Sequence, residues 1–137
     1  MKISTKGRYA LIIMLDLAKN YNSDKFITLK EISEKEHISL KYLEKIMLTL
    51  KNKDYFISSV GVSGGYKLKY EPSKYIIGDI LETAEGNIDV TDCVKEEHIC
   101  PMSHKCSTFR LWDELNTTIR NFLNSKTLED YVGDLNE

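Results

Sequence analysis

The sequence has no long apolar run, and this absence excludes the simplest membrane classes. No segment reaches the roughly 18 consecutive apolar residues that a transmembrane helix needs. The first 20 residues mix charges into their apolar stretch and lack a small-residue cleavage site, so we expect no secretory signal and no membrane partner. The 137 residues suit one domain, or a small domain plus an appendage, in the cytoplasm.

Cysteine is scarce, and its distribution argues against a disulfide framework. The three cysteines are an odd number, and all of them lie between positions 93 and 106. A reducing compartment keeps such thiols free. The sequence therefore raises the question of a metal or redox site.

A large net charge is also missing, because two opposite charges nearly cancel. Residues 1–70 hold 13 Lys and Arg against 7 Asp and Glu, a net charge of +6, whereas residues 71–137 hold 6 against 14, a net charge of −8. A basic half joined to an acidic half indicates that the first half meets a polyanion.

The basic half predicts three helices, the last two forming a helix-turn-helix. Apolar residues at helical spacing predict a helix over residues 5–22, with Lys6, Asp16 and Lys19 on its exposed face. The segment TLKE at 28–31 is a capping box that begins a short second helix. Ser39 is a plausible N-cap of a third helix that ends near residue 51.

The exposed face of the third helix carries residue types that read base edges and grip phosphates. An ordinary solvated face is the alternative. What favours DNA is the next segment, residues 55–70, where two β-rich stretches flank a turn with three glycines. A helix-turn-helix followed by a basic hairpin is the order of elements in winged-helix DNA-binding domains.

The acidic half predicts two further helices around a cysteine loop. The first, over residues 76–84, ends at Gly86. The second, over residues 108–126, has a wide, bulky apolar stripe that a small domain cannot cover, followed by a possible extra turn around Leu128. Pairing with the same helix of a second subunit would bury that stripe. The resulting two-fold dimer would carry two DNA-reading helices, one for each half of a palindromic site.

The cysteine loop has the spacing Cys-x6-Cys-x5-Cys and includes His98 and His104. Thiolates are soft ligands that select iron-sulfur clusters, zinc or copper(I). Structural zinc usually uses closer pairs, so these intervals favour a cluster without excluding zinc held by three cysteines and a histidine. Three unrelated thiols are the remaining alternative.

Several segments together resemble the Rrf2 family of bacterial transcription regulators: MKISTKGRYALIIMLDLA, SLKYLEKIMLTLK, SSVGVSGGYKL, the cysteine loop and LWDELNTTIRNFLNSKTLEDYV. The resemblance implies a homodimeric winged-helix protein in the cytoplasm of a bacterium. It also implies that Cys93, Cys100 and Cys106 hold a 2Fe-2S cluster, or less favourably a 4Fe-4S cluster, that senses cluster, iron, redox or nitric oxide status.

The sequence departs from the family pattern at three positions. Where family branches place a fourth cluster ligand, this chain has Phe109 or Arg8, neither of which ligates. His104, His98, Asp92, a carboxylate of the other subunit and a small thiol all remain candidates. Family wings also carry an arginine before the glycines, where this chain has Val60.

We therefore predict a mainly α fold with a small β-hairpin wing: a winged helix-turn-helix with a long C-terminal dimerisation helix. Residues 1–86 would bind DNA, 87–107 would hold the cluster, and 108–137 would form the dimerisation helix and tail. The residues expected in the major groove are Ser39, Lys41, Tyr42, Glu44 and Lys45. Those expected on the DNA backbone are Thr5, Lys6, Arg8, Ser63 and Lys67.

The predicted function is a DNA-binding transcriptional regulator, of the repressor type, that senses through the cluster. The alternative is a regulator of cysteine metabolism that acts through a cysteine-biosynthesis enzyme and uses its cysteines as thiol redox sensors. A small zinc enzyme has little support, since no catalytic base or nucleophile accompanies the cysteines.

Overall fold

The computed structural model describes residues 3–62, 64–94, 101–102 and 105–133. Three helices come first: α1 (Thr5–Lys19), α2 (Leu29–Glu36) and α3 (Leu40–Leu50). The hairpin follows as β1 (Phe56–Ser59) and β2 (Gly65–Leu68), then the 3-10 turn η1 (Pro72–Lys74) and α4 (Ile77–Glu85). The turn η2 (Asp92–Val94), the long α5 (Phe109–Asn124) and the short α6 (Glu129–Val132) complete the described chain. The predicted helices and hairpin are confirmed.

Local capping determines where these helices begin and end. The Ser4 side chain caps α1, and Thr28 and Glu31 form the predicted capping box of α2. Ser39 caps α3 by accepting from the Tyr42 amide at 3.3 Å, which confirms that prediction. Only three residues separate α2 from α3, and the first of them, His37, is left-handed with a φ of 58°. This tight turn produces the helix-turn-helix.

The hairpin is antiparallel, with Phe56 opposite Leu68 and Ser59 opposite Gly65. Its second strand is tied to the segment before α2: the Ile27 amide donates to the Tyr66 carbonyl at 2.9 Å, and the Tyr66 amide donates to the Ile27 carbonyl at 2.7 Å. The base of the wing is therefore fixed to the helix-turn-helix by backbone hydrogen bonds.

One hydrophobic core joins the two halves of the chain. Helix α1 packs against α3, α4, α6 and β2, and the fully buried side chains come from α1 to α4, from β2 and from Leu128 just before α6. The largest fully buried side chains are Ile13, Met14, Leu17, Ile32, Leu43, Met47, Leu50, Leu68, Ile80 and Leu128. Leu128 lies in this core from the N-cap position of α6, and its amide donates to the Tyr75 carbonyl at 3.0 Å.

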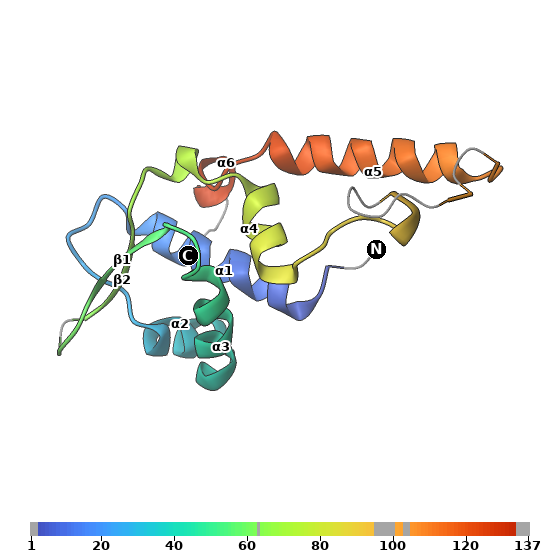
Figure 1. Ribbon diagram of the computed structural model, residues 1–137. Helices are drawn as coiled ribbons and strands as arrows, with labels where there is room; N and C mark the ends of the chain where they lie inside the picture. The colour runs from blue at the N-terminus through green and yellow to red at the C-terminus, as the bar shows by residue number, and fades with distance from the viewer. Residues whose placement is uncertain (1–2, 63, 95–100, 103–104, 134–137) are drawn as a thin grey trace.

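Helix α5 runs along the side of the molecule opposite α2 and α3, and one end extends past the helices around α1 (Figure 1). Its contacts are with α4 and η2. Within the described residues, no helix is long and apolar enough to span a bilayer.

One side chain contradicts the sequence-based placement. Asp16, expected on the exposed face of α1, is only 3% exposed. The end of α2 folds over it, and Lys35 Nζ lies 3.1 Å from Asp16 Oδ1 while Lys19 Nζ lies 3.7 Å away. A helical period shows which residues share a face, but not which other element packs there.

Candidate nucleic-acid interface

The outer face of α3 is available to a ligand. Lys41, Glu44 and Lys45 are exposed. Within the described part of the chain, none of these three side chains makes a hydrogen bond or an ion pair. An exposed helix face with unpaired cations is the form that DNA-reading helices take.

The other two residues predicted for this helix also have structural contacts. The Ser39 hydroxyl is occupied as the N-cap of α3. The Tyr42 ring is half-buried and packs edge-on against Tyr9 of α1, with ring centroids 5.7 Å apart. Each of them positions α3, whatever else it contacts.

The start of α1 presents two further cations. Lys6 and Arg8 are exposed, and Arg8 Nη2 donates to Thr5 Oγ1 at 3.4 Å. The preceding residue, Ser4, donates from its amide and its hydroxyl to the Glu85 carboxylate at the end of α4. This contact fixes the start of α1 against α4. Lys6 and Arg8 therefore extend from a helix end whose position is fixed.

In the wing, the lysines are turned toward the protein. Lys67 Nζ donates to the Ser23 carbonyl at 2.7 Å. Lys69 Nζ pairs with Asp54 at 2.9 Å, and this pair lowers the pKa of Asp54 and raises that of Lys69. Ser63, predicted to contact the DNA backbone, lies outside the described residues.

The cysteine loop is described in part. Cys93 lies in η2 and is half-buried, whereas Cys106 is exposed, just before α5. A hydrogen bond with the Thr108 hydroxyl at 3.4 Å is the main cause that lowers the Cys106 thiol pKa. Cys100, His98 and His104 lie outside the described residues, and among those described no three His, Cys, Asp or Glu side chains gather as a metal site.

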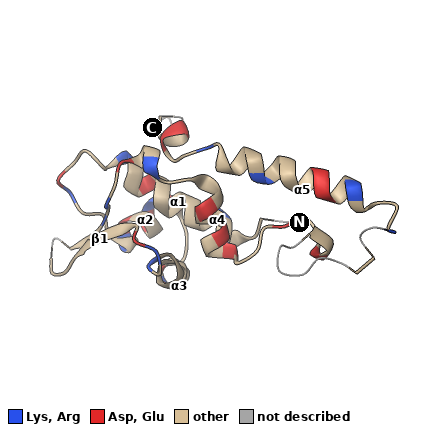
Figure 2. Ribbon diagram, turned by 45° about the horizontal axis from the view of Figure 1, so that its top comes forward, with Lys and Arg blue, Asp and Glu red and all other residues tan. Residues whose placement is uncertain are grey.

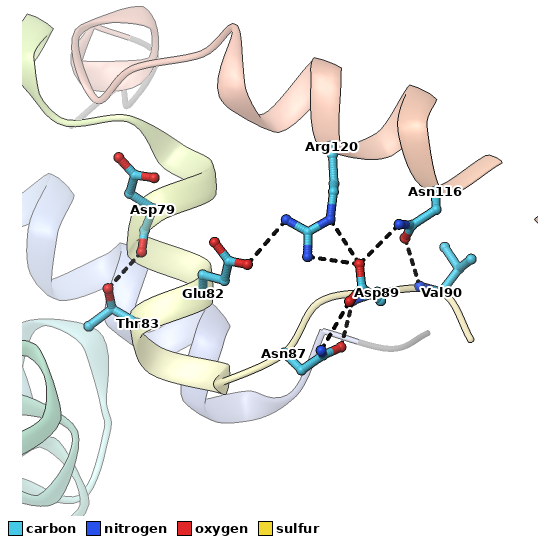
Figure 3. Close-up of polar contacts among 8 residues, drawn as sticks. All are labelled: Asp79, Glu82, Thr83, Asn87, Asp89, Val90, Asn116 and Arg120. Atoms are coloured by element: carbon cyan, nitrogen blue, oxygen red, sulfur yellow. Dashed lines mark hydrogen bonds and ion pairs between the residues drawn. The ribbon is translucent and has the colours of Figure 1, made fainter. Parts of the chain in front are cut away.

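A buried polar cluster, which we call the Asp89 clamp, holds the segment that leads to Cys93 (Figure 3). Asp89 accepts from Arg120 Nε at 2.8 Å and from Asn116 Nδ2 at 3.0 Å. The side-chain oxygen Oδ1 of Asn116 accepts from the Val90 amide at 2.9 Å, and Arg120 also donates to Glu82 of α4 at 3.1 Å.

The clamp therefore connects three elements: the loop before η2, helix α5 and helix α4. Burial alone would raise the Asp89 pKa, but the hydrogen bonds from Asn116, Arg120 and Asn87 outweigh it and hold the pKa below its usual value. This cluster was not predicted from the sequence. The one sign of it in the sequence is Asn116, a polar residue within the apolar stripe of α5. Asn116 is buried in the structure.

Charge is distributed over the structure as the sequence halves predict. Helix α4 carries three acidic side chains and no basic one, while exposed lysines lie on α3 (Figure 2). The exposed cations at the start of α1 and on α3 thus belong to the basic half of the chain, and α4 belongs to the acidic half.

Comparison with known proteins decides the family. The model of the Rrf2 family, described as iron-dependent transcriptional regulators, matches residues 3–134. The chain belongs to the Rrf2 family. The HTH-type transcriptional regulator IscR of Yersinia pestis is 35% identical over 134 residues, which cover 98% of this chain and 80% of that protein.

Solved Rrf2-family structures share the fold over almost the whole chain. CymR, the global cysteine regulator of B. subtilis, superposes with a TM-score of 0.81 at 35% identity, covering 99% of both chains. IscR of T. potens superposes with a TM-score of 0.77 at 30% identity, covering 98% of this chain and 88% of that one. The predicted winged-helix fold is confirmed, and the chain is a DNA-binding transcriptional regulator, not an enzyme.

Proposed function

We propose that this Rrf2-family protein is a cytoplasmic, homodimeric repressor that binds a palindromic operator under the control of an iron-sulfur cluster. The observation that carries the DNA contact is the face of α3, where Lys41, Glu44 and Lys45 are exposed and unpaired within the described chain. Lys6 and Arg8 at the start of α1 add phosphate contacts, which raise affinity on all sequences.

Dimer formation is supported by two neighbouring apolar surfaces, which share Phe122. Helix α5 exposes an apolar stripe, with Leu111, Leu115 and Phe122 each more than 40% exposed. A groove of about 550 Å³ lies between α1, α4 and α5, and its lining is mainly apolar. A second copy of α5 laid in that groove would cover both surfaces, and two-fold symmetry would repeat the contact.

The cluster is supported by the donor set and by the iron-dependent description of the family. Cys93, Cys100 and Cys106 would hold it, as 2Fe-2S in preference to 4Fe-4S, and the lowered pKa of Cys106 favours the thiolate that binds metal. When bound, the cluster would supply a redox-sensitive centre. The fourth ligand of the cluster is not assigned.

The Asp89 clamp offers the physical link between cluster and DNA. It ties the segment before Cys93 to α4 through Glu82 and to α5 through Asn116 and Arg120. Helix α4 packs on α1 and α3, which carry the predicted DNA contacts. A rearranged loop would thus shift the reading helices relative to one another.

The test is operator affinity with and without the cluster. Wild-type protein and Cys100→Ala, both reconstituted anaerobically, are titrated with one duplex at one salt concentration, with iron and sulfide counted in each sample. Ser107→Ala, in the same loop, is the control and should match wild type. Equal affinities of wild type and Cys100→Ala would contradict control by the cluster.

A companion pair of variants tests the assignment of the reading helix. Lys41→Ala should weaken binding and change sequence preference. Lys6→Ala should weaken it on all sequences and lower the salt slope by about one unit. A uniform effect from both variants would mean that α3 is not the reading helix.

A second candidate is favoured by the likeness to CymR of B. subtilis. In that case the protein would regulate cysteine metabolism through a cysteine-biosynthesis enzyme, and its cysteines would act as thiol redox sensors. Protein purified without oxygen separates the two: a cluster gives a brown protein, and a thiol sensor is colourless.

A further inference from the structure

The hydroxyl of Thr108 lies between a tryptophan and a cysteine at the start of α5. Trp112 Nε1 donates to Thr108 Oγ1 at 3.2 Å, and Thr108 Oγ1 lies 3.4 Å from Cys106 Sγ. An indole N–H is only a donor, whereas a hydroxyl has one proton and can also accept. Thr108 therefore accepts from Trp112 and keeps its own proton for the sulfur whenever Cys106 is a thiolate, which has no proton to donate.

The Thr108 hydroxyl is not used in the way that its place in the chain predicts. Thr108 is the N-cap residue of α5, where a threonine side chain ordinarily accepts from an amide of the first helical turn. Here the side chain makes no capping bond. Trp112 lies four residues further along, so the helix places it on the same face as Thr108. The hydroxyl is therefore bonded to the Trp112 and Cys106 side chains and not to the helix end.

Backbone hydrogen bonds hold Cys106 beside this hydroxyl. The Cys106 amide donates to the Met102 carbonyl at 2.8 Å, and the Cys106 carbonyl accepts from the Phe109 amide at 3.3 Å. Cys106 and Thr108 are both exposed, so the sulfur is open to a metal centre. Because a thiolate sulfur has more than one lone pair, it can bind iron and still accept the hydrogen bond from Thr108. We call the series Trp112, Thr108 and Cys106 the Thr108 relay.

We propose that Thr108, oriented by Trp112, donates a hydrogen bond to the Cys106 sulfur in the cluster-bound protein and thereby raises the reduction potential of the cluster. This inference rests on the proposed function, in which Cys106 is a cluster ligand. Hydrogen bonds to ligand sulfurs are among the features that tune the potentials of iron-sulfur clusters. Reduction adds one electron, taken from a chemical reductant, to the cluster and its ligands, and a donor beside the sulfur stabilises this more negative state. Thr108 is thus a positioning residue that acts through Cys106.

The experiment measures the reduction potential of the full chain after anaerobic reconstitution, by titration with a chemical reductant followed by visible absorption. Thr108→Val keeps the side-chain shape and removes the hydroxyl. It should shift the reduction equilibrium about tenfold toward the oxidised form, which is a potential about 59 mV lower for one electron. Thr108→Ser should restore the wild-type value. Trp112→Phe removes the donor that orients Thr108 and should shift the potential in the same direction as Thr108→Val.

Thr118→Val is the matched control. Thr118 is an exposed threonine of the same helix, and its hydroxyl donates to the Glu114 carbonyl at 2.8 Å, away from the cysteines. Its replacement should leave the reduction equilibrium within twofold of wild type. An equal shift in Thr108→Val and Thr118→Val would mean that loss of any α5 hydroxyl has this effect, and it would overturn the inference.

Three further outcomes would also overturn it. They are a Thr108→Val equilibrium within twofold of wild type, a potential that rises instead of falling, and a shift that Thr108→Ser does not reverse. An unchanged potential in Trp112→Phe would overturn the orienting role of Trp112. A Thr108→Val protein that takes up no iron, while Thr108→Ser takes up the wild-type amount, would support the bond, because the hydroxyl would then decide cluster binding.

Iron and sulfide counts on wild type keep this inference apart from the proposed function. A wild-type protein that takes up no cluster would overturn both. A wild type that holds the cluster, together with a Thr108→Val variant of equal potential, would overturn only the role of Thr108. A shifted potential in Thr108→Val, together with equal operator affinities of wild type and Cys100→Ala, would leave the relay standing and remove control by the cluster.

Discussion

At the scale of single residues, one buried carboxylate, Asp89, connects three segments of the acidic half. The Asp89 side chain is 4% exposed and lies 2.7 Å from Arg120 Nη2. By contrast, Glu114 is 61% exposed and lies 2.6 Å from Arg110 Nε. The two pairs have similar distances but different surroundings, and removing one member of a buried pair leaves the other without compensation.

We therefore expect Asp89→Asn to lower the free energy of unfolding by about 2–4 kcal/mol, because Arg120 and Asn116 lose a charged acceptor. Glu114→Gln, the matched exposed pair, should change it by less than about 0.5 kcal/mol. Denaturant unfolding followed by circular dichroism measures both variants. Similar effects would mean that burial of the Asp89 clamp contributes little.

The same carboxylate predicts a pH dependence. Because the folded-state pKa of Asp89 is held below its ordinary value of 3.8, its contribution is complete above that value and is lost as pH falls through the folded pKa. The stability difference between wild type and Asp89→Asn should be constant near neutral pH and shrink below about pH 4. A difference that grows on acidification would contradict the assigned direction.

Local sequence signals predicted some residues well and others poorly. The cap residues Thr28 and Ser39 were found because a cap depends on side chains within three positions of it. Asp16 was misplaced, and Asp89 was missed, because their partners come from 19 and 31 positions away. No local period contains that information.

At the scale of elements, the hairpin depends on one glycine where two chain segments approach closely. Gly65 has a φ of +134°, and a Cβ there would lie 2.5 Å from the Ile27 carbonyl oxygen. The glycine therefore serves both the turn and the bridge that fixes the wing against α2. The sequence predicted a flexible glycine turn, but only the fold shows which glycine meets another strand.

Gly65→Ala should thus destabilise the protein by about 2–3 kcal/mol, through backbone strain and loss of the Ile27–Tyr66 bridge. Gly133→Ala is the control, since no atom lies within 4 Å of its Cβ position, and it should be close to neutral. Thermal unfolding compares the two. An unchanged Gly65→Ala midpoint would show that the bridge can shift without cost.

At the scale of the whole molecule, the main open surface is the combination of the α5 stripe and the groove beside it. Trp112, Leu115 and Ile119 were predicted as part of a stripe too large for one small core, and Leu115 is 41% exposed. The groove that would receive it is lined by Leu11 and Leu15 of α1 together with Phe122 of α5. Residues about 100 positions apart thus form one apolar surface.

Leu115→Asp should convert the proposed dimer to a monomer, because the introduced carboxylate would be buried without a partner. Thr117→Asp, at an exposed position of the same helix, should leave the assembly unchanged. Sedimentation velocity at micromolar concentration gives the result. A wild-type monomer, or a Leu115→Asp variant that still dimerises, would contradict an α5-mediated dimer.

The sequence alone determined the elements and their order, because helical period, capping and turn residues act over a few positions of chain. Its charge halves and cysteine spacing also raised the DNA and cluster hypotheses before any contact was known. The tertiary structure decided what depends on distant partners: the burial of Asp16, the clamp at Asp89, the tethering of Lys67 to the Ser23 carbonyl, and the groove beside α5. Such contacts form only when segments far apart in the chain pack together, so no local pattern encodes them.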